Sequence, residues 1–321
     1  MSGREPATSA LGGGPGFAVG DAPSGQPFGY HPGEGFTPLV LSFPHVGLEW
    51  PERLGRAPQV NFARNADFEV DAIYPAAELS PAARVRARYS RLVVDLNRAE
   101  DDISPAVVPD HPAPRPRSQP GGTPTEASKK GSGIENRGVV WTHAVGRIPI
   151  LRRLDFAGFE ARIDAYHRPY YAALDQLLAH RVEHFGYAIL LDCHSMPSVV
   201  AHDLVLGTLD GASCDPRLAD LAQGALGGPS SPTAISLGLR RDDPYRGGEI
   251  VRRFGRPNAH VHALQLEVNR GLYMDELRLQ LRIASKDAKT QMTSASKRTR
   301  ELLARIQRLV EVLSRPGLSE L

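Results

Sequence analysis

Two histidines, each close behind a short apolar run, are the residues of this sequence best suited to metal chemistry. His194 comes after the run at residues 187–190, and His45 comes after the run at residues 38–43. Apolar runs that stop abruptly at polar residues predict buried strands, and ligand sites of α/β sheets gather at the carboxyl ends of strands. Asp192 lies two residues before His194, on the same face of a strand, where a carboxylate can orient a metal-ligating imidazole. The two strand ends together indicate a metal site.

A third ligand is needed, because a catalytic zinc site usually has three protein ligands and one position for water. Two carboxylates in the first quarter of the chain are candidates. Glu49 lies four residues after His45, and Asp67 lies further along the chain. Spacing alone does not choose between them, so the residues by themselves leave the third ligand open.

Metal-assisted hydrolysis also needs a carboxylate that is not a ligand. Zinc lowers the pKa of bound water from ~16 to ~7, and such a carboxylate then takes the proton and passes it to a leaving nitrogen. Glu267 is the candidate, because it lies within the apolar strand predicted over residues 261–268. A carboxylate there is costly unless it is used or paired. The alternative is a salt bridge between Glu267 and Arg270.

Two arginines, Arg91 and Arg98, flank the strand predicted over residues 91–96. A guanidinium group matches the shape of a carboxylate, so one arginine can anchor an acidic substrate, and another can stabilise an oxyanion. Surface ion pairs are the alternative.

The turn at residues 243–248 contains consecutive glycines, which let backbone amides approach a ligand, although an ordinary loop would have the same composition.

Strands and helices alternate along the chain, which predicts an α/β fold with a mixed, mostly parallel sheet flanked by helices. The apolar patterns predict strands at residues 38–43, 91–96, 187–194 and 261–268. Helices are predicted at residues 68–88, at residues 156–185 with a kink or break at Pro169, and at residues 294–314.

Two segments rich in proline and glycine divide the chain. Residues 1–36 are predicted to be a flexible lead-in. Residues 37–321 are predicted to form a single catalytic domain. This domain is interrupted at about residues 100–133 by an exposed, disordered insertion rich in proline.

Composition excludes several classes of protein. The chain has 321 residues, of which 41% are hydrophobic and 23% charged, as expected for a globular protein. The net charge of +2 gives no reason to expect a nucleic-acid partner, and two cysteines make no disulfide framework. No apolar stretch approaches membrane-spanning length, and no secretory signal begins the chain, so a cytoplasmic enzyme is expected. The oligomeric state is not predicted.

Five segments, in this order, resemble the N-formylglutamate amidohydrolase family. The resemblance covers roughly residues 37–280 and breaks at the proline-rich insertion. Each segment is short, but five in the same order are specific. The segments are residues 42–47 (SFPHVG), 90–98 (SRLVVDLNR), 192–198 (DCHSMPS), 206–211 (LGTLDG) and 265–270 (QLEVNR).

The resemblance implies a fold similar to that of zinc carboxypeptidases and aspartoacylase-type deacylases. It implies one zinc ion with His45 and His194 as ligands. It also favours Asp67 over Glu49 as the third ligand, although the family's usual Asp-Thr-Asp is Asn-Ala-Asp at residues 65–67. The implied reaction is hydrolysis of N-formyl-L-glutamate to formate and glutamate, a step of histidine degradation.

Roles for further residues follow from the same resemblance. Glu267 is implied as the general base, and Arg91 as the group that polarises the scissile carbonyl. The residues implied to lie against the substrate are Asn97 and Arg98, which would hold its carboxylate, and Tyr245, Gly247 and Gly248.

Two other functions stay open at this point. The same residues would serve a deacylase or carboxypeptidase-type hydrolase that acts on another N-acyl amino acid or peptide, because the pocket rather than the metal selects the substrate. A non-catalytic relative that binds an acidic ligand or a partner is the third hypothesis, and it gives no reason to retain both histidines and Glu267.

Overall fold

The computed structural model describes residues 19–20, 25–116, 137–231, 234–282, 294–315 and 317. Its centre is a seven-stranded sheet with the order β1-β3-β2-β6-β9-β7-β8. The strands of this sheet are β1 (Phe28–His31), β2 (Leu39–Phe43), β3 (Ala83–Ala87), β6 (Ala188–Met196), β7 (Leu204–Gly207), β8 (Leu239–Arg241) and β9 (Val261–Asn269). The pairs β3–β2, β2–β6, β6–β9 and β7–β8 are parallel, and β1–β3 and β7–β9 are antiparallel. The predicted mixed, mostly parallel α/β sheet is therefore confirmed.

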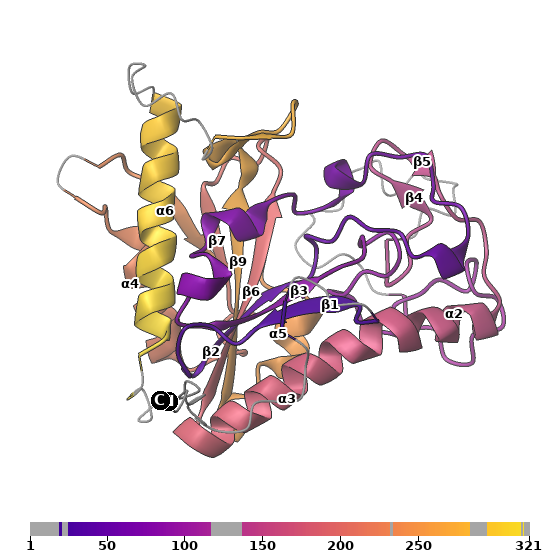
Figure 1. Ribbon diagram of the computed structural model, residues 1–321, viewed down its shortest axis with the longest axis horizontal. Helices are drawn as coiled ribbons and strands as arrows, with labels where there is room; N and C mark the ends of the chain where they lie inside the picture. The colour runs from indigo at the N-terminus through magenta and orange to yellow at the C-terminus, as the bar shows by residue number, and fades with distance from the viewer. Residues whose placement is uncertain are drawn as a thin grey trace, which may run out of the picture.

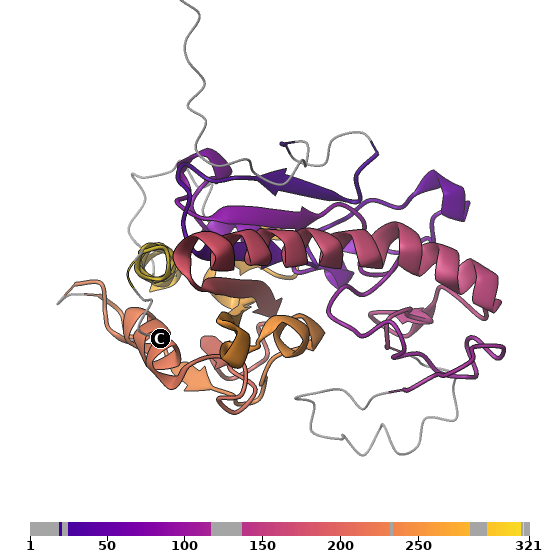
Figure 2. The same cartoon turned by 90° about the horizontal axis from the view of Figure 1, so that it is seen from below.

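Helices cover both faces of the sheet (Figure 1). On one face lies a long rod made of α2 (Phe156–Arg162), a π-helical turn (Ile163–His167) and α3 (Arg168–Phe185), with the short α5 (Glu249–Phe254) near it. On the other face α4 (Pro216–Gly227) and α6 (Ser294–Leu313) pack side by side. Figure 2 shows the rod lengthwise in front of the strands, with α6 seen nearly end-on.

Successive residues of the central strands point to opposite faces, so they divide between two cores. In β6, Leu191 and Cys193 belong to the core beneath α4 and α6, whereas Leu190 belongs to the core beneath α3. Asp192 and His194 continue the series of Leu190 and therefore lie on the α3 side. Cys193 is buried on the opposite face, as its position between them predicts.

Most elements with a strong apolar pattern are where the sequence predicts them. The strands predicted at residues 38–43, 187–194 and 261–268 are β2, β6 and β9, and the carboxyl-terminal helix is α6. The helix predicted over residues 156–185 does not break at Pro169. The π-helical turn directly before α3 shifts the hydrogen-bond register, which accommodates a residue without an N–H group.

Two predicted elements are wrong. Residues 68–88, predicted as helical, form two 3-10 turns (Val70–Ile73 and Ala77–Leu79) and then β3, whose buried Ala83, Val85 and Ala87 alternate with period two. Residues 91–96, predicted as a strand, form turns. Their apolar side chains are buried nevertheless, because an apolar run records burial and not the pairing of a backbone.

The predicted segment boundaries also need correction. The lead-in predicted over residues 1–36 is too long, because β1 lies within it and adds an edge strand with buried Phe28 and Tyr30. The insertion predicted over residues 100–133 is not exposed throughout, because Ile103 and Val107 are fully buried in the α3-side core. Residues 1–18, 21–24 and 117–136 lie outside the described residues.

Small elements complete the described chain. Two hairpins pair β4 (His143–Ala144) with β5 (Ile148–Pro149) and β10 (Met274–Asp275) with β11 (Gln280–Leu281). Further 3-10 turns are Glu52–Leu54, Phe62–Asn65, Pro257–Ala259 and Arg270–Leu272. None of the helices described has both the length and the apolar character needed to cross a membrane.

Candidate active site

The candidate site lies at the carboxyl ends of β2, β6 and β9, on the α3 side of the sheet. His45 follows β2 by two residues, and His194 lies near the end of β6. Asp67 comes from the segment after the 3-10 turn Phe62–Asn65, and its backbone N–H donates to the His45 carbonyl at 2.9 Å. Two parallel strands and one loop therefore bring the three side chains together.

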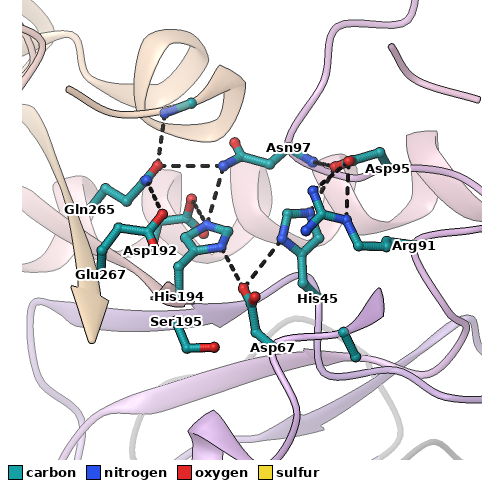
Figure 3. A network of polar contacts seen from close by, with 12 residues as sticks. His45, Asp67, Arg91, Asp95, Asn97, Asp192, His194, Ser195, Gln265 and Glu267 are labelled. Carbon is teal, nitrogen blue, oxygen red and sulfur yellow. Dashed lines mark hydrogen bonds and ion pairs between the residues drawn. The ribbon is translucent and has the colours of Figure 1, made fainter. Parts of the chain in front are cut away.

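Three donor atoms of these residues face one another. Asp67 Oδ2 lies 2.9 Å from His194 Nδ1 and 3.4 Å from His45 Nδ1. All three ligand atoms lie within 4.8 Å of one another, and all three residues are buried. Figure 3 shows the Asp67 carboxylate between the two imidazole rings.

The chemistry of this cluster fits a divalent metal ion. His45 Nδ1 is buried and has no hydrogen-bond partner within the described chain. A buried nitrogen of this kind is costly unless a ligand uses its lone pair. Two imidazole nitrogens and one carboxylate oxygen are also a ligand set of catalytic metal sites that keep an open position. The cluster is therefore compatible with one metal ion.

The other nitrogen of each imidazole contacts a buried carboxylate. His45 Nε2 lies 2.7 Å from Asp95 Oδ1, and His194 Nε2 lies 2.7 Å from Asp192 Oδ2. When each Nε2–H donates to its carboxylate, each Nδ1 lone pair is directed to the cluster. Asp192, predicted as the partner of His194, is confirmed in that position, where the Ser42 hydroxyl also donates to it at 2.9 Å.

The charges of the cluster favour a bound cation. Burial alone would raise the pKa of Asp67, but the two imidazoles that face it hold that pKa well below its usual value. Burial would likewise raise the pKa of Asp95, but the charges of Arg91 and His45 hold it well below. Burial opposes charge on His194, yet the charge of Asp192 and its hydrogen bond hold the pKa of His194 well above the usual value. Without a metal ion, a proton on His194 supplies the positive charge.

Glu267 lies beside this cluster, and its pKa is raised. It pairs in register with His194 across β9 and β6. Burial raises its pKa to about 7, with repulsion from Asp67 and Asp192 adding to the effect and the histidine charges opposing it. Gln265 Nε2 donates to Glu267 Oε1 at 2.9 Å. A carboxyl group with this pKa can both accept and donate a proton near neutral pH.

A cavity of about 290 Å³ opens above these residues. Every residue that the family resemblance implies as a metal ligand, catalytic group or substrate contact lines it. These residues are His45, Asp67, Arg91, Asn97, Arg98, His194, Tyr245, Gly247, Gly248 and Glu267.

Two of the predicted substrate contacts also interact with the protein itself. Asn97 Oδ1 accepts from the Ile250 N–H at 2.9 Å, and its Nδ2 lies 3.2 Å from His194 Nε2 and 3.4 Å from Gln265 Oε1. Arg98 Nη1 lies 3.9 Å from Asp102 Oδ2. Both residues keep a face on the cavity, and their contact with a substrate stays a prediction.

Arg91 is held in place by Asp95 and Trp141. Its Nε and Nη2 donate to Asp95 Oδ2 at 3.2 and 2.6 Å, and its guanidinium carbon lies 4.7 Å from the centre of the Trp141 ring. Neither contact uses Nη1, and no other described residue bonds to that nitrogen. Arg91 therefore presents the two N–H groups of Nη1 from a fixed position.

The glycine turn packs closely against Asn97. A Cβ on Gly248 would approach the Asn97 side chain to 2.2 Å, and the Gly248 N–H donates to Gln265 Oε1 at 2.7 Å. Gly247 has a φ of +124°, a conformation that favours glycine. Burial and the charges of Glu267 and Asp67 raise the pKa of the Tyr245 hydroxyl in the same turn.

The structure places the residues of two alternatives that the sequence left open, which are Glu49 as a ligand and a salt bridge between Glu267 and Arg270. Glu49 is half-exposed at the surface, where it accepts from Arg88 Nε at 2.9 Å, so it is not part of the cluster. Arg270 forms its ion pairs with Asp67 and Glu276, and no described contact joins it to Glu267.

Sequence reasoning missed three contributors to the site. Asp95 lay inside a run interpreted as a strand, Gln265 lay two residues before Glu267, and Arg270 was considered only as a partner of Glu267. Asp95 and Gln265 carried a usable signal, because each lies two residues from a residue already assigned to the site. Arg270 carried none, because its partner Asp67 is distant in the sequence.

Comparisons with known proteins show which family this chain resembles. The family model described as N-formylglutamate amidohydrolase matches residues 37–274. N-formylglutamate deformylases from Pseudomonas putida and Pseudomonas aeruginosa are each 31% identical to the chain over 258 residues, covering 76% and 75% of the chain and 84% of each relative. The crystal structure of N-formylglutamate amidohydrolase from Ralstonia eutropha JMP134 has a TM-score of 0.66 and 28% identity over 89% of this chain and 98% of that chain. A gene product of Agrobacterium tumefaciens, with a TM-score of 0.52 and 18% identity over 79% and 89% of the two chains, shares the fold.

Proposed function

The chain belongs to the N-formylglutamate amidohydrolase family, and we propose that it hydrolyses N-formyl-L-glutamate to formate and L-glutamate. One observation carries this proposal: His45, Asp67 and His194 direct three donor atoms at one point, in a cavity that Glu267 also lines. The relatives named deformylases support the choice of a formyl amide as substrate. The cytoplasmic location stays a prediction from the sequence.

We propose zinc as the metal, held by His45, Asp67 and His194. The donor set and its burial support this choice, and the buried Nδ1 of His45 gains a partner. When bound, the ion supplies Lewis-acid polarisation of a carbonyl and lowers the pKa of a water molecule toward neutrality.

Glu267 then acts as the general base and acid. With its pKa near 7, it takes a proton from the water that attacks the formyl carbon. The same carboxyl group returns that proton to the nitrogen as the C–N bond breaks, so glutamate leaves with a neutral amine. Arg91 donates from Nη1 to the carbonyl oxygen as negative charge develops there. Its contacts with Asp95 and Trp141 keep that donor in place.

Substrate carboxylates would bind among the polar groups of the cavity wall. Arg98 is assigned to a substrate carboxylate because a guanidinium group presents two parallel N–H donors. Asn97, Tyr245 and the turn with Gly247 and Gly248 would close the other sides. Further arginines at the cavity favour an acidic substrate over a neutral one; they are Arg64, Arg137 and Arg246.

Release of the free amino acid from each substrate, together with formate from the formyl compounds, tests this function directly. The purified protein is assayed with N-formyl-L-glutamate, N-acetyl-L-glutamate, N-succinyl-L-glutamate and N-formyl-L-alanine, before and after removal of metal with a chelator. We expect the highest kcat/KM for N-formyl-L-glutamate, loss of activity on chelation and recovery with zinc. A preference for another acyl group would identify a substrate other than the proposed one. Hydrolysis of none of the four compounds would favour a non-catalytic binding protein.

A further inference from the structure

Asp67 has two carboxylate oxygens with different partners. Oδ2 faces His45 and His194, whereas Oδ1 accepts from Arg270 Nη2 at 3.3 Å. Asp67 lies on a loop and not in a strand, so no ladder of backbone bonds aims its side chain. The terminal torsion of an aspartate is broad, so the plane of the carboxylate can rotate away from the two imidazoles unless a contact prevents it.

We propose that Arg270 is a positioning residue of the metal site, which fixes the orientation of the Asp67 carboxylate so that one oxygen faces the metal while the other stays on the guanidinium group. This inference rests on the proposed metal site and deepens it. Arg270 would act through Asp67 and would touch neither the substrate nor the metal. The guanidinium group suits this role because it is planar and presents several donors in fixed directions.

Arg270 also joins the two segments that carry ligands. Its Nη2 donates to the Ala66 carbonyl at 2.7 Å, next to Asp67 in the chain, and its Nε donates to Ser195 Oγ at 3.0 Å, next to His194. One side chain, only 12% exposed, therefore fixes the loop of Asp67 against the end of β6. Loss of this group would release both the carboxylate and the spacing between the segments.

Arg270 is itself held from the side away from Asp67. Its Nη1 donates to Glu276 Oε1 at 3.1 Å. Glu276 Oε2 in turn accepts from the N–H and hydroxyl of Ser198, at 2.8 and 2.5 Å. Glu276 contributes no atom to the metal cluster, so its substitution loosens Arg270 without removing it.

Metal affinity, measured on the protein without substrate, tests the proposal. Metal-free wild type, R270M, E276Q and S195A are titrated with Zn²⁺ against a chromophoric chelator, and the visible spectrum of each Co²⁺-loaded protein is recorded. We expect R270M to bind Zn²⁺ about 10–100-fold more weakly and to change the Co²⁺ spectrum, because contacts that orient ligands have effects of this size. We expect E276Q and S195A to lose affinity by smaller factors. The control is R278M, since Arg278 lies in the nearby turn between β10 and β11, has a side chain that is 75% exposed, and pairs only with Asp275 among described carboxylates.

The melting temperature of each metal-free variant separates folding from positioning. If R270M folds and binds Zn²⁺ as tightly as wild type with an unchanged Co²⁺ spectrum, the proposal is wrong. If R270M does not fold, E276Q and S195A decide, and wild-type affinity in both would overturn it. Weakened metal binding in these variants, together with failure of wild type to release formate, would support Arg270 in this role and reject the proposed substrate.

Discussion

Glu267 and His194 occupy paired positions on the adjacent parallel strands β9 and β6, so backbone pairing sets a carboxyl group beside a cluster imidazole. Both residues point to the α3 side of the sheet because strands alternate their side chains. The separation of the proposed base from His194 is therefore set by the pairing of two strands and not by a loop. This relationship motivates the first two predictions.

E267Q should abolish turnover and leave metal binding intact. Glutamine keeps the size of the side chain but neither accepts nor returns a proton, and loss of a general base typically costs about 10²–10⁴-fold in kcat. Formate release and zinc content of the purified variant measure the two effects. The control is E49Q, which changes an exposed carboxylate outside the cluster. Activity of E267Q near that of wild type would remove Glu267 from its assigned role.

The stability of the metal-free protein should depend on pH because the pKa of Glu267 is raised on folding. The Glu267 pKa is about 7 in the folded protein against an ordinary value of 4.5, so folding favours the protonated form. The stability that this proton provides is complete below pH 4.5 and is lost as the pH rises through 7.

The comparison of wild type with E267Q isolates that loss. The other titrating groups are present in both proteins, so their effects on stability cancel in the difference. Relative to wild type, E267Q should gain in melting temperature between pH 4.5 and 7 and show no further gain above it. Thermal unfolding in chelator at pH 4.5, 6, 7 and 8 measures the difference. A constant gap across this range would contradict the raised pKa.

D95N should weaken metal binding without removing a ligand. Asp95 fixes the His45 ring through Nε2 and also accepts from Arg91 and Trp141, and an amide cannot accept from all three. We expect Zn²⁺ affinity to fall by about 10–100-fold, with a loss of kcat because Arg91 is also released. Chelator competition provides the measurement, and D220N at an exposed ion pair is the control. Unchanged affinity in D95N would show that Asp95 does not orient His45.

Q265M should lower kcat and shift its pH profile. The Gly248 N–H donates to Gln265 Oε1, which fixes the amide so that its Nε2 must donate to Glu267. Methionine fills the space but gives Glu267 no donor, so the carboxylate form is less stable and the acid limb of kcat/KM should move to higher pH. One hydrogen bond to a charged group corresponds to about 10-fold in kcat.

Steady-state kinetics between pH 5.5 and 8.5 test this effect of Gln265. Q307M is the matched control, because Gln307 is exposed on α6 and its side chain bonds, among the described residues, only to Glu311. A rise in KM with unchanged kcat and pH profile would assign Gln265 to substrate binding instead.

The sequence by itself determined the central strands and the chemistry at their ends. The apolar runs before His45 and His194 and around Glu267 are continuous and local, and strands buried on both faces need such runs. Asp192 was predictable as the partner of His194 because the distance of two residues along a strand fixes a shared face. The family resemblance likewise depends on short segments that can be read without a structure.

Only the tertiary structure decided what depends on contacts between distant segments. Asp67, which the family resemblance already favoured over Glu49, lies beside the two histidines because of the path of a loop, and apolar patterns do not encode that path. The turn containing Asp95 was interpreted as a strand because its apolar side chains are buried, yet its backbone has no partner strand. Arg270 contacts Asp67 across 203 positions of the sequence. Local pattern determines which faces are buried, whereas the directions of polar side chains depend on how the whole chain packs.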